Sequence, residues 1–369
     1  SAGFDFRADV FGHGQVDQVS VDAVSLTIGR VQAGLQEPVP RPITVAWHYG
    51  WHDRVRRQLL QQTVRYLGGN YLSNDPVVES EFNRLKNEFG VTVDALSWIP
   101  HRVTPTILPN YQTGYFSADN AATRYVSLLY EAALALPHVG GRVDFRSTAV
   151  RDTLVGDFAA MAQTLVEARD QYPTRVFLLD GRPVVFLFAS HAWGLNPDDT
   201  VEFRQMTTVV SQAREAFGRV YGTPPYLVGD ELLPMATTVT PSPDRVNRTI
   251  LFDAIYAYHP ANLKRNAPPF SINEAYGALQ RGRLVRVAAA VRGLRSRFTN
   301  NPILIIPSVA GGFAKHGFPT LSTSRGAYAD FLKLLSRYYA DVYLPEEWPG
   351  AVGTAALPAP VYTVGSWNE

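Results

Sequence analysis

Residues 303–309 read Ile-Leu-Ile-Ile-Pro-Ser-Val, and residues 183–189 read Pro-Val-Val-Phe-Leu-Phe-Ala. Such short, continuous apolar runs are typical of parallel β-strands that are covered on both faces. Comparable runs rich in Val, Ile, Leu, Phe and Tyr occur at residues 43–47, 93–98, 142–145, 226–228, 252–258 and 361–364. The sequence therefore predicts eight strands of one parallel sheet.

Segments with the apolar spacing of helices lie between these strands. Residues 75–89 begin with an Asp-Pro pair and place four apolar side chains on one face: Val78, Phe82, Leu85 and Phe89. The other expected helices are at residues 122–136, 158–172, 200–217, 272–298 and 325–339. Eight strands alternating with helices predict an α/β fold, a (β/α)8 TIM-type barrel. A doubly wound open sheet is the alternative.

The N-terminal region has a different pattern. Residues 4–10 and 19–28 alternate apolar and polar side chains and are separated by a glycine-containing turn. This pattern predicts a short N-terminal β segment over residues 1–37, either a hairpin or the end of a carbohydrate-binding β-sandwich. Residues 38–42 contain three prolines and predict a stiff linker to the barrel at 43–369. Because no helix follows the eighth strand, we expect the natural chain to continue, and further domains are possible.

Composition excludes several classes of function. The 369 residues carry 34 Lys+Arg against 33 Asp+Glu, so no sequence-wide basic field attracts nucleic acid. No apolar run approaches the roughly 20 residues that a membrane-spanning helix needs. The chain has no cysteine, which excludes disulfides, thiolate zinc sites and cysteine nucleophiles. Aromatic residues make up 12%, and aromatic faces suit both sugar rings and protein interfaces.

In a barrel of this type, functional residues lie at the carboxyl ends of the strands. The first strand end reads Trp-His-Tyr-Gly-Trp-His over residues 47–52 and predicts an aromatic, sugar-facing surface, with structural packing of these side chains as the alternative. His48 and His52 are four residues apart, but Gly50 between them disfavours the helix that a metal-binding pair at this spacing requires. No metal site is therefore predicted, and no cofactor is predicted because the phosphate-loop and dinucleotide-binding glycine motifs do not occur. The expected substrate-binding residues are Trp47, His48, Tyr49, Trp51, Trp98, His191, Tyr256 and His259.

Two adjacent carboxylates, Asp230 and Glu231, follow the fifth strand. Carboxylates at a barrel mouth fit acid/base work on a glycosidic bond. Because consecutive strand residues point to opposite faces, only one of the two is expected to enter the cavity. The structural alternative is a carboxylate that caps a helix N-terminus. After the eighth strand, Asn368-Glu369 places a third candidate catalytic carboxylate, Glu369, at a strand end.

Four segments together resemble the glycoside hydrolase family 99-like barrels, which include endo-α-mannosidases and related polysaccharide-locus proteins. Tyr-Leu-Ser-Asn-Asp-Pro at 71–76, with Phe-Gly-Val-Thr-Val-Asp at 89–94 and Ser-Trp at 97–98, looks like one region of the family. Asp-Gly-Arg-Pro-Val-Val-Phe at 180–186 and Ile-Pro-Ser-Val-Ala-Gly-Gly-Phe at 306–313 are similar to its fourth- and seventh-strand segments. Ser-Trp-Asn-Glu at 366–369 is similar to the start of its signature after the eighth strand.

The resemblance implies metal-independent hydrolysis of glycosidic bonds with retention. In the mannosidases of the family, one signature glutamate assists the 2-hydroxyl of the sugar as an internal nucleophile, and a second acts as acid/base. Glu369 matches the first, and the position of the second lies beyond it. The leading hypothesis is therefore a bacterial glycoside hydrolase, extracellular or on the cell surface, with a polysaccharide or oligosaccharide substrate. One alternative is a non-catalytic carbohydrate-binding barrel of a larger surface or secreted protein. Another is a structural assembly module.

Overall fold

All residues that the structure describes belong to one compact unit, Pro40–Glu369. The computed structural model describes residues 42–50, 72–172, 174–195, 200–231, 243–258, 287, 289–309, 312–313, 321–322, 339, 344–349, 352–354, 357 and 359–366. The expected N-terminal β segment at 1–37 lies outside these residues, as does most of the linker. The domain boundary therefore stays a prediction.

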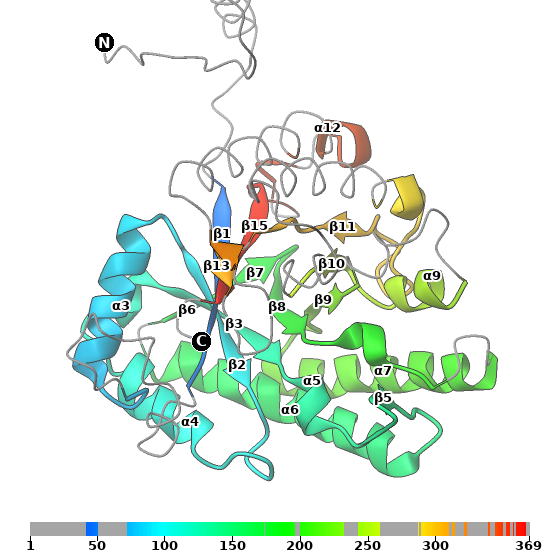
Figure 1. The fold of residues 1–369 in the computed structure, drawn as a ribbon, viewed down its shortest axis with the longest axis horizontal. Helices are drawn as coiled ribbons and strands as arrows, with labels where there is room; N and C mark the ends of the chain where they lie inside the picture. The colour runs from blue at the N-terminus through cyan, green and yellow to red at the C-terminus, as the bar shows by residue number, and fades with distance from the viewer. Residues whose placement is uncertain are drawn as a thin grey trace, which may run out of the picture. The chain divides into compact units, whose positions relative to one another are not determined.

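A ring of parallel strands forms the centre of this unit (Figure 1). In ring order the strands are β1 (Ile43–His48), β2 (Val93–Trp98), β3 (Tyr125–Tyr130), β8 (Arg182–Leu187), β9 (Tyr226–Asp230), β10 (Ala254–Tyr256), β11 (Leu304–Ile305) with β12 (Ser308–Val309), and β15 (Val361–Ser366). Most of their side chains are buried, as expected for strands that are covered on both faces.

The seventh strand closes the ring. Its first part, β11, pairs with β10, and its second part, β12, pairs with β15, which in turn pairs with β1. Between the two parts, the Ile306 N–H donates to the Ile255 carbonyl at 2.9 Å, and the Pro307 carbonyl accepts from the Thr363 N–H at 2.9 Å. Hydrogen bonds therefore run on both sides of the seventh strand. The predicted (β/α)8 TIM-type fold is confirmed, and the doubly wound open sheet is excluded.

Helices and short connecting elements surround the ring. The helical elements are α3 (Pro76–Glu88), α4 (Ile107–Asn110), η2 (Tyr111–Tyr115), η3 (Ala121–Thr123), α5 (Ala132–Ala135), α6 (Thr148–Asp170), η4 (Ser190–Ala192), α7 (Thr200–Tyr221), α9 (Pro243–Thr249) and α12 (Leu344–Glu347). The short strands are β4 (His138–Val139), β5 (Arg142–Val143), β6 (Arg175–Val176), β7 (Leu178–Leu179), β13 (Gly312–Phe313) and β14 (Leu321–Ser322). The long helices α6 and α7 lie side by side (Figure 1). Within the described part of the chain, no helix has the length and apolar character to cross a membrane.

The third strand is not where the sequence predicted it. The prediction of a helix over residues 122–136 is wrong, because Tyr125–Tyr130 is strand β3 and pairs with β2 and β8. The segment predicted as the third strand, 142–145, instead contributes β5 to a small antiparallel hairpin with β4. An apolar run of this length satisfies helical and strand spacing equally, so its pattern alone does not decide between them. Burial between two neighbouring strands decides it.

Helix α3 packs on the barrel with a polar face. Asp75 caps its N-terminus by accepting from the Val77 N–H at 3.0 Å. The fully buried residues of the helix are Glu79, Asn83 and Lys86. The apolar face that the sequence predicted is only half-buried, and its last member, Phe89, is 72% exposed. The helix was therefore predicted correctly and its buried face was not. The expected helices at 272–298 and 325–339 fall largely outside the described residues.

Gly229 in strand β9 allows the close approach of Phe252, and we predict that an added methyl group destabilises the barrel. A Cβ atom at Gly229 would lie 2.3 Å from the Phe252 ring, which is fully buried. Gly229→Ala is therefore expected to lower the free energy of unfolding by about 1–3 kcal/mol, as measured by urea denaturation. The matched control is Gly156→Ala in helix α6, where a Cβ meets nothing within 4 Å. That change is expected to stabilise the protein by about 0.5–1 kcal/mol. Equal effects of the two substitutions would contradict the packing argument.

Candidate active site

The carboxylate of Asp230 joins three strand ends of the barrel. Asp230 is the last residue of β9 and is almost fully buried. Its Oδ1 accepts the Tyr258 N–H at 3.0 Å, just after β10. Its Oδ2 accepts the Ala189 N–H at 3.2 Å, just after β8. Two main-chain donors therefore orient one carboxylate at the carboxyl edge of the barrel, where enzymes of this fold place their active sites.

The main chain beside Asp230 is strained. Ala189, whose N–H donates to Asp230, has a φ of 57°, in the left-handed region that residues other than glycine rarely adopt. The same residue precedes η4, so the strained position turns the chain from strand β8 into the segment that carries His191. Strain of this kind is concentrated at functional sites.

His191 lies against Asp230 and faces solvent. Its Nδ1 is 3.2 Å from the Asp230 carbonyl oxygen and 3.5 Å from the Asp230 Oδ2. Its side chain is 43% exposed. Burial of the ring disfavours the imidazolium, but the hydrogen bond and charge of Asp230, with the charge of Glu231, outweigh this and raise the pKa of His191. An exposed donor beside a buried carboxylate is suited to contact a polar ligand.

We predict that His191 titrates above the ordinary histidine value of about 6.5 and that Asp230 is the cause. An NMR titration of the His191 ring protons measures the midpoint directly. In Asp230→Asn the midpoint is expected to fall, because the side-chain carboxylate that stabilises the imidazolium is lost. A His191 midpoint that is the same in both proteins would contradict this assignment. The raised pKa means that any stability from this pair is present below the unfolded-state pKa and lost as pH rises through the folded-state pKa.

Glu231 has different partners from Asp230. It is fully buried, and its Oε1 accepts from the Ser190 hydroxyl at 3.0 Å. Arg248, on helix α9, contacts both oxygens of Glu231 at 3.4 Å. Burial raises the pKa of Glu231, against the opposing effects of Arg248, His191 and Ser190. Glu231 thus joins the strand end to α9, whereas Asp230 joins it to the neighbouring strands.

Glu131 is a site residue that the sequence analysis missed. It directly follows β3, is buried, and its Oε1 accepts from the Ser97 hydroxyl at 2.9 Å. Burial raises the pKa of Tyr256 well above its ordinary value, and the negative charges of Asp230 and Glu131 add to this effect. The charges of Asp230 and Glu131, at the ends of two different strands, therefore both raise the pKa of the buried Tyr256 hydroxyl. The helix predicted over residues 122–136 conceals this strand end, although Tyr125–Tyr130 has the composition of a strand.

The aromatic residues of the first strand end form a buried cluster. Trp47 packs against Phe186 and Tyr256, stacks on Tyr258, and donates its indole N–H to the Tyr258 carbonyl at 3.3 Å. The hydroxyl of Tyr49 contacts the hydroxyl of Tyr258. Trp47, Tyr49 and Tyr256 are all fully buried, and Tyr258 is half-buried. Among these four rings, Tyr258 therefore presents the most surface.

Trp98 lies in a different place from these rings. Its indole N–H donates to the Thr164 hydroxyl of helix α6 at 3.1 Å. It lines a groove of about 630 Å³ between α6 and the loop after β2, together with His101, Asp152 and Glu167. The structure thus places Trp98 toward the outer helix layer, apart from the rings of the first strand end.

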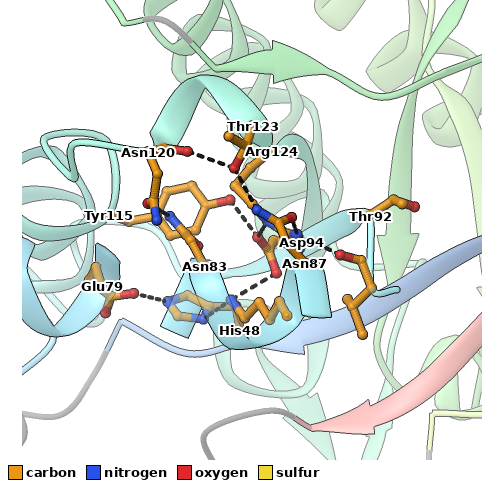
Figure 2. A network of polar contacts seen from close by, with 12 residues as sticks. His48, Glu79, Asn83, Asn87, Thr92, Asp94, Tyr115, Asn120, Thr123 and Arg124 are labelled. Carbon is orange, nitrogen blue, oxygen red and sulfur yellow. Dashed lines mark hydrogen bonds and ion pairs between the residues drawn. The ribbon is translucent and has the colours of Figure 1, made fainter. Parts of the chain in front are cut away.

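His48 belongs to a buried polar network behind strand β1, which Figure 2 shows from close by. Its Nε2 is 3.1 Å from the Glu79 Oε2, and its Nδ1 is 2.9 Å from the Lys86 Nζ. Lys86 also contacts the Asp94 Oδ1 at 2.8 Å. Both ring nitrogens of His48 therefore face helix α3. Among the described residues, no group of three acidic or histidine side chains is arranged to hold a metal ion.

Three expected site residues, Trp51, His259 and Glu369, lie outside the described residues, and so does His52. Of the expected site residues, the structure brings Asp230 and His191 together in one group. A second group consists of Trp47, Tyr49 and Tyr256, which lie beside Tyr258. The remaining three expected residues have other partners: Glu231 contacts Arg248, Trp98 contacts Thr164, and His48 contacts Lys86.

No protein-family profile and no curated protein sequence matches the chain. Solved structures do. The chain is similar to the GH99 endo-alpha-mannosidase from Bacteroides thetaiotaomicron in complex with BIS-TRIS-propane, with a TM-score of 0.51 and 17% identity over 89% of this chain and 84% of that chain. It is also similar to a glycoside hydrolase-like protein, with a TM-score of 0.59 and 14% identity over 91% of this chain and 88% of that one. At such identities the likeness is one of fold, and it agrees with the resemblance seen in the sequence motifs.

Proposed function

We propose that the chain is a glycoside hydrolase that cleaves glycosidic bonds of a polysaccharide or oligosaccharide with retention and without a metal ion. The observation that carries the proposal is the Asp230 carboxylate, held at the carboxyl edge of the barrel by the Ala189 and Tyr258 amides with His191 beside it. The barrel fold shared with a glycosidase and a glycosidase-like protein supports it.

In this proposal Asp230 stabilises the positive charge that develops on the sugar as the glycosidic bond breaks. His191, exposed and with a raised pKa, donates a hydrogen bond to a sugar oxygen. Glu131, missed in the sequence, is a second buried carboxylate at a strand end. The sequence motif after the eighth strand supports a role for Glu369 in assisting the 2-hydroxyl of the sugar. We also propose that the enzyme acts outside a bacterial cell or on its surface.

One observation favours a second candidate, a carbohydrate-binding barrel without catalysis. Both oxygens of Asp230 already accept main-chain hydrogen bonds, and Glu231 is engaged by Arg248 and Ser190. Because these two carboxylates are occupied by protein donors, the site is suited to bind sugar hydroxyls through His191 and Tyr258 without cleaving bonds.

The test is mass-spectrometric detection of products from a panel of polysaccharides incubated with the chain and with its Asp230→Asn and Glu369→Gln variants. Products from the parent chain that are lost in Asp230→Asn support the proposal and identify the sugar class. Products that persist unchanged in both variants contradict the roles of these two residues. Binding by calorimetry without any product supports the binding barrel. The configuration of the released sugar, followed by NMR, decides between retention and inversion, and undiminished cleavage in EDTA is expected.

A further inference from the structure

The buried network behind strand β1 is balanced in charge. It contains two carboxylates, Glu79 and Asp94, and two cations, Lys86 and Arg124, and all four are fully buried. The Nε of Arg124 and the hydroxyl of Tyr115 both donate to the Asp94 Oδ2, at 2.8 and 2.6 Å. Buried charges at this depth are tolerated only when they are paired and hydrogen-bonded. The network is therefore a specific arrangement, and each member depends on the others.

This arrangement determines the tautomer of His48. The ammonium group of Lys86 has only donors, so the Nδ1 of His48 must accept from it. The Nε2 of His48 then carries the hydrogen and lies 3.1 Å from the Glu79 Oε2. With a neutral His48, the charges of the network sum to zero. His48 is thus oriented from both sides by two residues of the same helix, α3.

The main chain of His48 leads directly to the candidate active site. Its carbonyl accepts from the Tyr111 hydroxyl at 2.9 Å. Its two neighbours, Trp47 and Tyr49, both contact Tyr258 through their polar atoms. The N–H of Tyr258 in turn donates to Asp230. A continuous series of contacts therefore joins Lys86 on the outer helix to the carboxylate at the barrel mouth.

We propose that Lys86 and His48 are positioning residues for the barrel mouth. By orienting the His48 ring from α3, they fix the strand end that places Trp47 and Tyr49 on Tyr258, and through Tyr258 they orient Asp230. Neither residue contacts substrate. The structural part of this inference stands on the contacts alone, and its catalytic consequence rests on the proposed function.

The experiment compares Lys86→Met with the parent chain by NMR at neutral pH. The indole N–H resonance of Trp47, assigned through a Trp47→Phe variant, reports on the bond to Tyr258, and nitrogen shifts of labelled histidine rings report on the His48 tautomer. In Lys86→Met we expect the Trp47 signal to shift or broaden and His48 to lose its single tautomer. The matched control is Arg84→Met, which removes a cation from the exposed face of the same helix and is expected to leave both signals unchanged. An unchanged Trp47 signal in folded Lys86→Met would overturn the proposal.

If Lys86→Met does not fold, the variants His48→Gln and His48→Leu test the same proposal through the Trp47 signal. The glutamine amide in His48→Gln can accept from Lys86 and donate to Glu79, so the Trp47 signal is expected to stay in place. His48→Leu can do neither, so the signal is expected to move. The same signal in both variants would overturn the proposal. Where the parent chain turns over a glycan, Lys86→Met is expected to lower kcat by about 10- to 100-fold with little change in KM. An unchanged kcat would overturn the catalytic consequence. If no glycan is cleaved, the proposed function fails while the NMR comparison still tests the positioning.

Discussion

Asp230→Asn is expected to lower the rate of glycoside cleavage by about 10²–10³-fold, the usual cost of removing one preorganised group that stabilises charge in the transition state. Asparagine has only one accepting oxygen, so either the Ala189 or the Tyr258 N–H loses its acceptor, and the side chain no longer carries charge beside His191. The measurement is the initial rate of product release by mass spectrometry, with folding checked by circular dichroism.

The control for this substitution is Asp144→Asn. Asp144 is a partly exposed residue, paired with Arg146 at 3.1 Å in the connection between β5 and α6. The same change of carboxylate to amide is expected to leave the rate of product release unchanged there. If Asp230→Asn retains the activity of the control, then Asp230 is a structural bridge between strands, and the catalytic carboxylates must be sought at Glu131 and Glu369.

Asp94→Asn is expected to lower the free energy of unfolding by about 3–5 kcal/mol, because it leaves Lys86 and Arg124 buried without their shared counter-ion. Denaturation in urea, followed by fluorescence, measures this loss. The exposed Arg169–Asp170 pair provides the control. Asp170→Asn is expected to leave the midpoint unchanged, because solvent screens a surface pair. A similar midpoint for Asp94→Asn would mean that the network contributes no net stability.

The pH dependence of this contribution has a definite sign. Although burial opposes ionisation, Lys86 and Arg124 hold the pKa of the Asp94 carboxyl well below its ordinary value. A group with a lowered folded-state pKa stabilises the protein above its unfolded-state pKa, about 3.9, and loses this effect as pH falls through the folded-state value. The difference in stability between the parent chain and Asp94→Asn is therefore expected to be constant near neutral pH and to shrink below about pH 4.

The helix α3 shows how far apolar spacing can be trusted. Its existence and its Asp75 cap follow from local signals, because capping and helical spacing are properties of adjacent residues. Its buried face does not follow, because Glu79 and Lys86 are buried only by virtue of His48 and Asp94, which lie on two strands. The spacing of apolar residues predicts which face of a helix is apolar. It does not show whether a charged side chain has a buried partner elsewhere in the chain.

The apolar runs of the sequence also explain why Asp230 and His191 were predicted as site residues and Glu131 was not. Asp230 and His191 were predicted because each follows a run whose length and apolar character mark it as a strand. Glu131 was missed because the run before it, Tyr125–Tyr130, satisfies the helical spacing as well. One misassigned element thus concealed one carboxylate of the barrel mouth.

The sequence by itself determined the alternation of strands and helices, and with it the barrel, because covered parallel strands and helices have distinct repeats over a few residues. Only the tertiary structure decided which six residues form the third strand, which oxygens of Asp230 and Glu231 meet which donors, and which charges are buried behind strand β1. These outcomes depend on contacts between segments far apart in the chain. Hydrogen bonding and desolvation set their energies, and neither is encoded in the spacing of neighbouring residues.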